Sequence, residues 1–494
     1  MRKISDHNSF LILLAFYFFL ATFLLDRYQR VWVDEPWESI TASTLIHEGK
    51  LYNPVLENYS GFDKILLQPR LFINGALAPV FALFGVGHMQ GRLASVVCGA
   101  LLLLAVYLLT KDSFSKRISL LATWFTAIET MLFISYRTIR PEIYLVTLET
   151  FSLMFFLKGV RSNSGKFFFW SGLFAGIGLW THPNGILHVG AILALLLAAY
   201  KGKAFTSKNS WVFAAAGIIA VIPYVAYVVF NDAQNSFATF YLQLDNRTSA
   251  LASQNWFVTS FRGEWNRIVE ITQFPYRLPA VLIFIGVWFL SVRSKDTATR
   301  YIALAVGVHA LLSFLMIANK TVVYASSILP MLCILSAVAV DRELGDSFSV
   351  TQVMKNAFDA QHLRQSLAIL IILVFTVNQL AGDARLLWRN KDCSYSETVQ
   401  RLQSVIPGNA KLWGSITFWF AFQHQPMRSQ YTYLREVEAF KPEYMITGDA
   451  EVWGKEFWKP VREKADSLIG QRGSLVATLP ENCYGHLRVY RMKW

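Results

Sequence analysis

Charged residues are scarce in this chain: Asp, Glu, Lys and Arg make up 16% of its 494 residues, whereas 54% are hydrophobic. A soluble domain of this length cannot bury so much apolar surface, so the composition excludes an ordinary soluble protein and indicates a multi-span membrane protein. The net charge of +13 would suit nucleic-acid binding. Because Lys and Arg lie in short clusters between apolar runs, as in membrane-protein loops, we predict no nucleic-acid partner.

Cysteine is also rare, with four residues in the whole chain. Cys98 and Cys333 fall in apolar runs and are predicted to be core residues, while Cys393 and Cys483 fall near the C-terminus. An oxidising compartment there would permit a disulfide, although the sequence alone does not prove the pairing. CxxC, HExxH, P-loop and GxGxxG motifs are missing from any credible context, so the common metal, nucleotide and dinucleotide sites have no sequence signature here.

What the chain does contain is a series of apolar runs, which predict about eleven transmembrane helices. The first, Phe10–Leu25, follows Arg2 and Lys3 without a convincing cleavage site, and we interpret it as a retained anchor and not a signal peptide. The predicted spans begin near Phe10, Leu93, Ile118, Ile143, Phe167, Ile186, Trp211, Pro279, Tyr301, Ala325 and Gln365.

Basic residues mark alternate loops between these spans. The clusters are Lys111/Lys116/Arg117, Lys158/Arg161/Lys166, Lys201/Lys203/Lys208, Arg293/Lys295/Arg300 and Arg342/Lys355/Arg364. By the positive-inside rule these loops and the N-terminus are cytoplasmic. An odd number of spans then puts the C-terminus outside.

The distribution of apolar runs divides the chain into two predicted parts. Residues 1–381 form a transmembrane domain with long outer loops at 26–91 and 231–278. Residues 382–494 mix short strand-like runs such as "EYMITG" and "HLRVYRMKW" with helical segments, which predicts a small extracytoplasmic α/β domain.

The connections predicted to lie outside carry an unusual set of polar residues: Asp34, Glu35, Arg137, Arg140, Glu142, His182, Lys320 and Tyr324. Carboxylates can deprotonate a hydroxyl, while Arg, Lys, His and Tyr can bind a phosphate. A phosphate ester whose lipid chain lies among the helices would fit both groups of residues.

Four short motifs in order, Asp34-Glu35 after the first span, "RTIRPE", "THPNG" and "NKTVVYASSILP", resemble those of the GT-C glycosyltransferases. The closest branch is the protein O-mannosyltransferase and aminoarabinose transferase group, which includes bacterial enzymes. The resemblance extends over the whole chain and is strongest in the membrane part.

This resemblance implies an inverting transfer of a sugar from a polyprenyl-phosphate donor to a hydroxyl acceptor on the outer face of a bacterial inner membrane. Asp34 matches the family's general base, and Glu142 stands where the second family acid, usually Asp, is found. Lys320 and Tyr324 match residues that hold the lipid phosphate, and His182 stands where relatives often carry Lys. Glu35 completes the predicted catalytic set. We assign Arg137 and Arg140 to the phosphate on their charge and position alone.

One segment departs from the family pattern. Relatives often carry Lys-Pro-Pro or His-Pro-Pro in the first outer loop, and some use it near a metal. This chain reads "LLQPRLF", with Gln68 and Arg70. A divalent metal is therefore left unassigned, and no cofactor is predicted with certainty.

Each candidate residue also has a structural interpretation. Asp34, followed by Pro36, suits a helix N-terminus, and Glu35 and Glu38 suit a solvated helix face. Glu142 could pair with Arg137 or Arg140. In the same way His182 suits an interfacial turn, Lys320 a snorkelling lysine, and Tyr324 an aromatic belt.

Two other functions compete with transfer. A multi-span transporter or lipid flippase fits the length and charge, but the sequence has no evident inverted repeat and no charged pathway in mid-span. A non-catalytic scaffold would use the outer domain to hold partners. The sequence specifies neither the sugar nor the acceptor, which could be a lipid, another envelope glycan or a protein.

Overall fold

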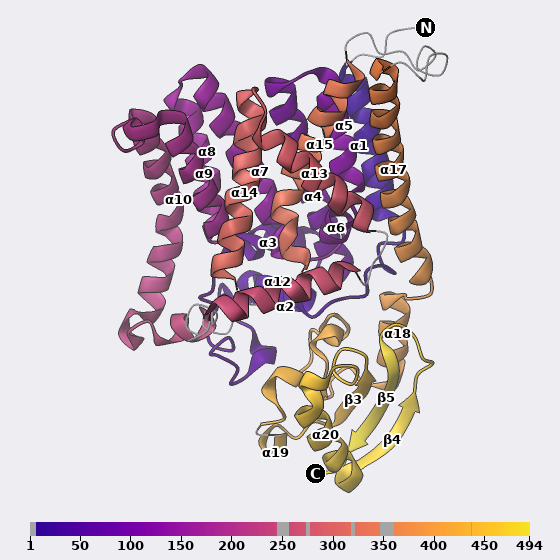
Figure 1. Cartoon of the computed structure of the whole chain (residues 1–494). Coiled ribbons are helices and arrows are strands. Elements are labelled where there is room, and N and C mark those ends of the chain that lie inside the picture. The colour runs from indigo at the N-terminus through magenta and orange to yellow at the C-terminus, as the bar shows by residue number, and fades with distance from the viewer. Residues whose placement is uncertain (1–5, 245–255, 273–276, 318–321, 346–359, 436) are drawn as a thin grey trace.

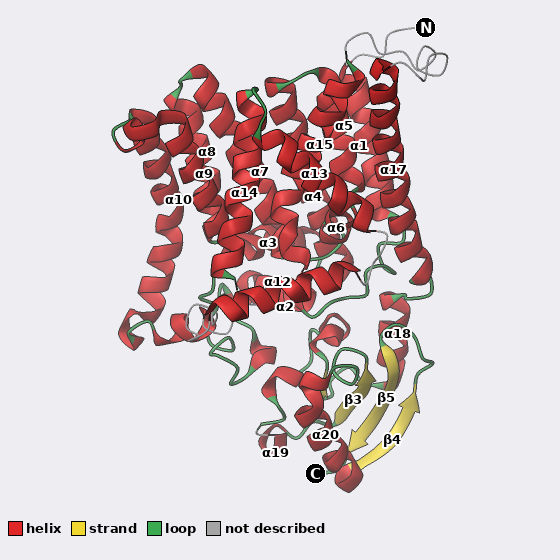
Figure 2. Ribbon diagram, viewed as in Figure 1, coloured by secondary structure: helices red, strands yellow, loops and turns green. Residues whose placement is uncertain are grey.

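The computed structural model describes residues 6–244, 256–272, 277–317, 322–345, 360–435 and 437–494. A bundle of helices forms one part of the molecule, and a smaller domain that contains a sheet lies beneath one end of it (Figures 1 and 2). The predicted fold class is confirmed: the chain is a multi-pass helical membrane protein with a C-terminal α/β domain.

Every predicted span coincides with a helix. These helices are α1 (Asp6–Thr22), α4 (His88–Ser113), α5 (Lys116–Ile128), α7 (Pro141–Ser162), α8 (Gly165–Leu179), α9 (Gly185–Tyr200), α10 (Lys208–Asp232), α13 (Leu278–Val292), α14 (Thr297–Met316), α15 (Leu329–Leu344) and α17 (Ala360–Arg389). Seven helical segments in the described parts of the chain are long and apolar enough to cross a membrane. The helices α1, α5, α8 and α13 contain 17, 13, 15 and 15 residues, short of the roughly 20 that a perpendicular span needs.

Shorter helices lie at the end of the bundle that faces the C-terminal domain. The first outer loop contains two helices, α2 (Asp34–Glu48) and α3 (Leu71–Phe84), with η1 (Pro54–Leu56) between them. The short α6 (Thr130–Ser135) precedes α7, and η5 (Val322–Ile328) precedes α15. The amphipathic α12 (Trp256–Thr272) runs across the ends of the long helices (Figure 1). This end of the bundle therefore has a layer of polar connections.

The C-terminal domain is built on a five-stranded sheet of order β2-β1-β3-β5-β4. Its strands are β1 (Leu412–Gly414), β2 (Met427–Ser429), β3 (Tyr444–Asp449), β4 (Gly473–Thr478) and β5 (Gly485–Met492). Strand β1 pairs in parallel with β2 and β3, and β5 pairs antiparallel with β3 and β4. The helices are α18 (Tyr395–Val405), α19 (Val437–Phe440) and α20 (Lys459–Arg472). The boundary predicted after residue 381 lies within α17, which continues to Arg389.

Several contacts fasten this domain to the first outer loop. Asp26 accepts hydrogen bonds from Ser394 Oγ at 2.6 Å and Ser396 Oγ at 2.7 Å, and it contacts His88 Nε2 at 2.9 Å. The Val31 amide donates to Tyr484 Oη at 2.8 Å. Within the C-terminal domain, Cys393 and Cys483 form the disulfide that their location permitted. The hydrogen bonds of Asp26 and Val31 therefore hold the C-terminal domain against the segment that precedes α2.

Candidate active site

A cavity of about 570 Å³ opens where the polar connections meet the C-terminal domain. Its wall combines residues of α2, the first outer loop, the α6–α7 and α8–α9 connections, and η5. Five of the predicted site residues line it: Asp34, Arg140, Glu142, His182 and Tyr324. Of the other three predicted residues, Lys320 lies outside the described residues, and Glu35 and Arg137 lie outside the lining. Side chains from distant parts of the sequence thus share one space.

Asp34 is the first residue of α2, and the N-cap position belongs to Val33. Its side chain is 21% exposed and lines the cavity, with Oδ2 3.4 Å from Arg140 Nη2. Asp34 therefore lies at a helix N-terminus, as its sequence context suggested, but Val33 and not Asp34 is the N-cap. The carboxylate is available to a ligand in the cavity.

Arg140 joins the two acidic residues of the cavity. Its Nε and Nη2 donate to the Glu142 carboxylate at 3.1 and 2.8 Å, a bidentate pair at the start of α7. Burial disfavours the charge on Arg140, but Glu142 and Asp34 outweigh burial and raise the pKa of its guanidinium. The pairing of Glu142 with Arg140 is thus real, and it takes place in the cavity wall.

His182, in the α8–α9 turn, and Tyr324, in η5, also line the cavity. Their ring centroids are 5.6 Å apart. His182 Nδ1 accepts a hydrogen bond from the Asn184 amide at 3.1 Å, which makes Nε2 the donor nitrogen of the ring. A phosphate oxygen is a suitable acceptor for such a donor.

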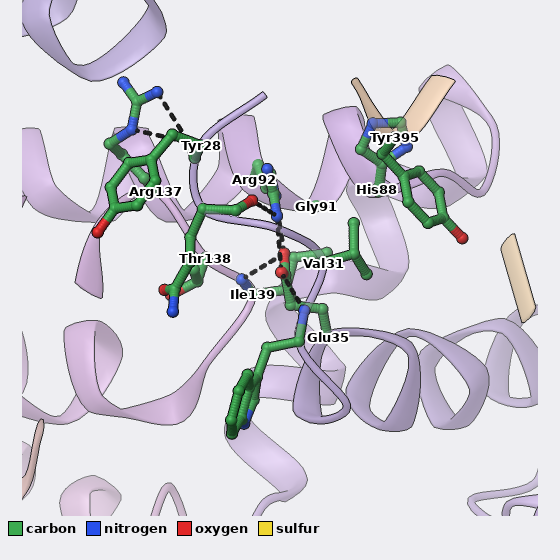
Figure 3. A network of polar contacts seen from close by, with 12 residues as sticks. Tyr28, Val31, Glu35, His88, Gly91, Arg92, Arg137, Thr138, Ile139 and Tyr395 are labelled. Carbon is green, nitrogen blue, oxygen red and sulfur yellow. Dashed lines mark hydrogen bonds and ion pairs between the residues drawn. The ribbon is translucent and has the colours of Figure 1, made fainter. Parts of the chain in front are cut away.

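Glu35, the neighbour of Asp34 in sequence, contacts Arg92 and Ile139 in a polar network (Figure 3). Its carboxylate is fully buried and accepts from Arg92 Nε and Nη2 at 2.8 and 2.7 Å. The amides of Trp32 and Ile139 also donate to it, at 3.0 and 3.3 Å. The expectation of a solvated side chain is wrong for Glu35, and Glu35 lies outside the cavity lining. Its contacts join the loop before α2 to α4 and to the α6–α7 connection.

Arg137 also lies away from the cavity, although its charge and position suggested phosphate binding. Its guanidinium donates to the carbonyls of Leu20, Ala21, Phe23 and Tyr28 at 2.7 to 3.2 Å. Figure 3 shows the contacts with Tyr28. Since α1 ends at Thr22, these groups include carbonyls that the last helical turn leaves without partners. Arg137 therefore caps α1.

The cavity also contains residues that the sequence did not assign. Trp37, Gln68, Arg70 and Tyr431 all line it. Arg70 forms an ion pair with Glu38, whose other oxygen is 3.3 Å from Asn74 Nδ2. Glu38 is fully buried, so a solvated position is wrong for it too. The departure from the family motif at Gln68 and Arg70 was the one sequence signal; the Tyr431 position carried none.

The described residues contain no group of three or more His, Cys, Asp or Glu side chains that could hold a metal ion. Between Asp34 and Glu142 stands the Arg140 guanidinium. The residues present do not fit a metal site of that kind, and we derive no step through a metal.

Comparison with known proteins supports the family resemblance. The profile of the dolichyl-phosphate-mannose-protein mannosyltransferase family matches residues 72–230, which include Arg140, Glu142 and His182. No curated protein matches the chain by sequence.

Solved structures match nearly the whole chain. ArnT from Cupriavidus metallidurans, bound to undecaprenyl phosphate, is 14% identical with a TM-score of 0.65, and the match covers 97% of each chain. The apo oligosaccharyltransferase of Archaeoglobus fulgidus is 13% identical with a TM-score of 0.57, over all of this chain and 75% of that one. The Archaeoglobus fulgidus AglB complex with an inhibitory peptide and a dolichol-phosphate is 13% identical with a TM-score of 0.55, over 99% and 74%. The chain therefore has the GT-C fold, as its sequence motifs indicated.

Proposed function

We propose that this protein transfers a sugar from a polyprenyl-phosphate donor to a hydroxyl acceptor in the cavity that Asp34 lines. The observation that carries the proposal is the position of Asp34: a carboxylate at the start of α2 that faces the cavity and lies 3.4 Å from Arg140. The fold supports the same class of reaction, because structures that share it include one with bound undecaprenyl phosphate and one with a dolichol-phosphate.

The proposed reaction is a single displacement. Asp34 accepts the proton of the acceptor hydroxyl as its oxygen forms a bond to the anomeric carbon. The bond between that carbon and the phosphate oxygen breaks, and the prenyl phosphate leaves with the electron pair. Attack opposite the leaving group inverts the anomeric configuration. A phosphate leaves readily as an anion, so one carboxylate base suffices, whereas a glycosidase needs a second carboxyl group as an acid.

The cationic and hydroxyl-bearing side chains would hold the leaving phosphate. Arg140 supplies a guanidinium next to Asp34 and Glu142, and the rings of His182 and Tyr324 lie beside each other in the same lining. Lys320 belongs to this proposed group by its sequence position. Donors already in place stabilise the charge that develops on the leaving phosphate without reorganisation.

A second cavity would accommodate the lipid chain. It measures about 790 Å³ and lies between α3, α4, α7 and α8. Its lining is largely apolar and includes Phe72, Leu93, Val97, Phe151 and Phe174. Phe72 comes two residues after Arg70, and its ring lies 6.1 Å from that of Trp180, two residues before His182. The prenyl chain of a donor whose phosphate lies in the polar cavity would occupy this second cavity.

We place this site on the outer face of a bacterial inner membrane, because the basic loops predict that orientation. Within the class, the acceptor would be a lipid A or lipopolysaccharide sugar, another envelope glycan or a secreted protein.

The test is to incubate the purified protein in lipid with a panel of undecaprenyl-phosphate sugars and to measure released undecaprenyl phosphate by mass spectrometry. Release that depends on Asp34 supports the proposal. Movement of an intact lipid-linked sugar across the bilayer, with none consumed, would instead support a flippase.

A further inference from the structure

One wall of the cavity contains hydrogen-bond donors that lack acceptors. Trp37 Nε1, Gln68 Nε2 and Arg70 Nε are buried, and no acceptor for them occurs among the described residues. Their side chains are 5%, 1% and 2% exposed, and all three line the cavity. A buried donor without an acceptor is unfavourable, so three of them on one wall point to a ligand rich in oxygen acceptors.

This wall carries little net charge. The charge of Arg70 is balanced by Glu38, with which it forms a buried ion pair. Trp37 and Gln68 are neutral. A wall of nearly neutral donors suits the uncharged hydroxyl and ring oxygens of a sugar, which need hydrogen-bond donors and no net charge.

Aromatic rings stand beside these donors. The ring centroid of Trp37 lies 5.1 Å from that of Phe62 and 5.4 Å from that of Tyr431, and both pairs of rings are nearly edge to face. Tyr59 lies 5.2 Å from Tyr431, and all four rings line the cavity. Their apolar faces next to polar donors suit the alternating C–H and O–H surfaces of a saccharide.

The C-terminal domain supplies one of these rings. Tyr431 follows β2 and packs against Trp458 of the same domain at 5.2 Å. Ser429 Oγ donates to the carbonyl of Val55, in the first outer loop, at 3.1 Å. This hydrogen bond joins the segment that carries Tyr431 to the loop after α2. The domain thus completes the wall.

Asp34 and Trp37 are three residues apart on α2, so their side chains lie on neighbouring positions of one helix face. A ring held by the wall would be beside the proposed base.

From this geometry we infer that Trp37, Gln68, Arg70 and Tyr431 form the subsite for the sugar of the lipid-linked donor, and that they determine which sugar is transferred. This inference rests on the proposed function. Donor hydrogen bonds and ring contacts would act on the sugar, while Arg140, His182 and Tyr324 act on the phosphate.

The experiment measures the Kd of two ligands: bare undecaprenyl phosphate, and the undecaprenyl-phosphate sugar that the wild-type protein consumes. Trp37→Phe and Gln68→Met each remove one side-chain donor function and keep most of the volume, while Tyr431→Ala removes a ring. Arg70 is not substituted, because its loss would leave the buried Glu38 carboxylate without its ion-pair partner. Trp413→Phe is the matched control, since Trp413 Nε1 is also buried without a described partner but lies in the C-terminal domain outside the cavity lining.

We expect each cavity variant to weaken binding of the sugar-bearing lipid about 3- to 10-fold, as expected for one lost hydrogen bond or ring contact, with the Kd of the bare lipid unchanged. The control variant should change neither Kd. An equal loss for both ligands would assign the wall to the phosphate, and an unchanged pair of Kd values would remove it from donor binding; either result overturns the inference. If the wild-type protein consumes no sugar of the panel, the proposed function fails first, which separates the two outcomes.

Discussion

Asp34 Oδ2 and Arg140 Nη2, from residues far apart in the sequence, lie 3.4 Å from each other in the cavity lining. The contact depends on the buried network beneath it, because Glu35 accepts from Arg92 and from the Ile139 amide, next to Arg140. The two neighbouring acids thus have different surroundings: Asp34 lines the cavity, and Glu35 is buried in hydrogen bonds to the adjacent backbone and to Arg92.

Replacing Arg92 with Met tests the structural role of Glu35. The change leaves a buried carboxylate without its bidentate partner, which costs about 3–5 kcal/mol. We expect a clear fall in the midpoint of thermal unfolding in detergent. Asp34→Asn, measured alongside, should leave the midpoint unchanged. Equal midpoints for Arg92→Met and the wild type would contradict the network.

The two arginines of the α6–α7 connection should respond differently to Lys. Arg140→Lys loses the bidentate fork in the cavity, so we expect a KM for the donor raised about tenfold with a folded protein. Arg137→Lys loses most of its hydrogen bonds to the end of α1 and should lower stability instead. Steady-state kinetics together with thermal unfolding separates these effects, and a donor KM raised by Arg137→Lys at unchanged stability would disagree with the assignment.

The disulfide should matter for both stability and turnover. The bond between Cys393 and Cys483 encloses Tyr431, and closing a segment of 90 residues stabilises a protein by about 2–4 kcal/mol. We expect Cys393→Ser together with Cys483→Ser to lower the unfolding midpoint and to weaken binding of the sugar-bearing lipid. Cys98→Ala and Cys333→Ala, at the free buried cysteines, are the comparison. Sugar-lipid affinity equal to wild type in the double variant would show that the bond is dispensable for the site.

Acid should loosen the C-terminal domain through Asp26. Burial disfavours its charge, but hydrogen bonds from His88, Ser394 and Ser396 outweigh burial and lower its pKa below the ordinary value. A depressed folded-state pKa gives stability that is present above the unfolded pKa of about 3.9 and is lost as pH falls through the folded value. Asp26→Asn should therefore be less stable than wild type at pH 7, with the difference shrinking as pH falls below about 4. Thermal unfolding across that range measures it, and a constant difference would rule out Asp26 as its source.

Much of the fold follows from the sequence because long apolar runs require helices in a bilayer. The start of each span was predictable, and so was the gathering of Asp34, Arg140, Glu142, His182 and Tyr324 on one side. Glu35 was not separable from Asp34, because one helical step of about 100° turns it toward Arg92, a residue of another helix. Arg137 was misassigned because its acceptors are backbone carbonyls, which no side-chain pattern reveals. Tyr431 lines the cavity because the C-terminal domain packs against the rest of the chain. Local sequence periodicity does not predict such a contact between domains.

The central claim is that Asp34 is the base for sugar transfer. Its most direct measurement is the rate of undecaprenyl phosphate release by Asp34→Asn, with Asp112→Asn as control because Asp112 pairs with Lys158 away from the cavity. We predict a rate at least about 100-fold below wild type for Asp34→Asn, with donor binding and unfolding midpoint retained, and a wild-type rate for Asp112→Asn. Turnover of Asp34→Asn at the wild-type rate would contradict the account.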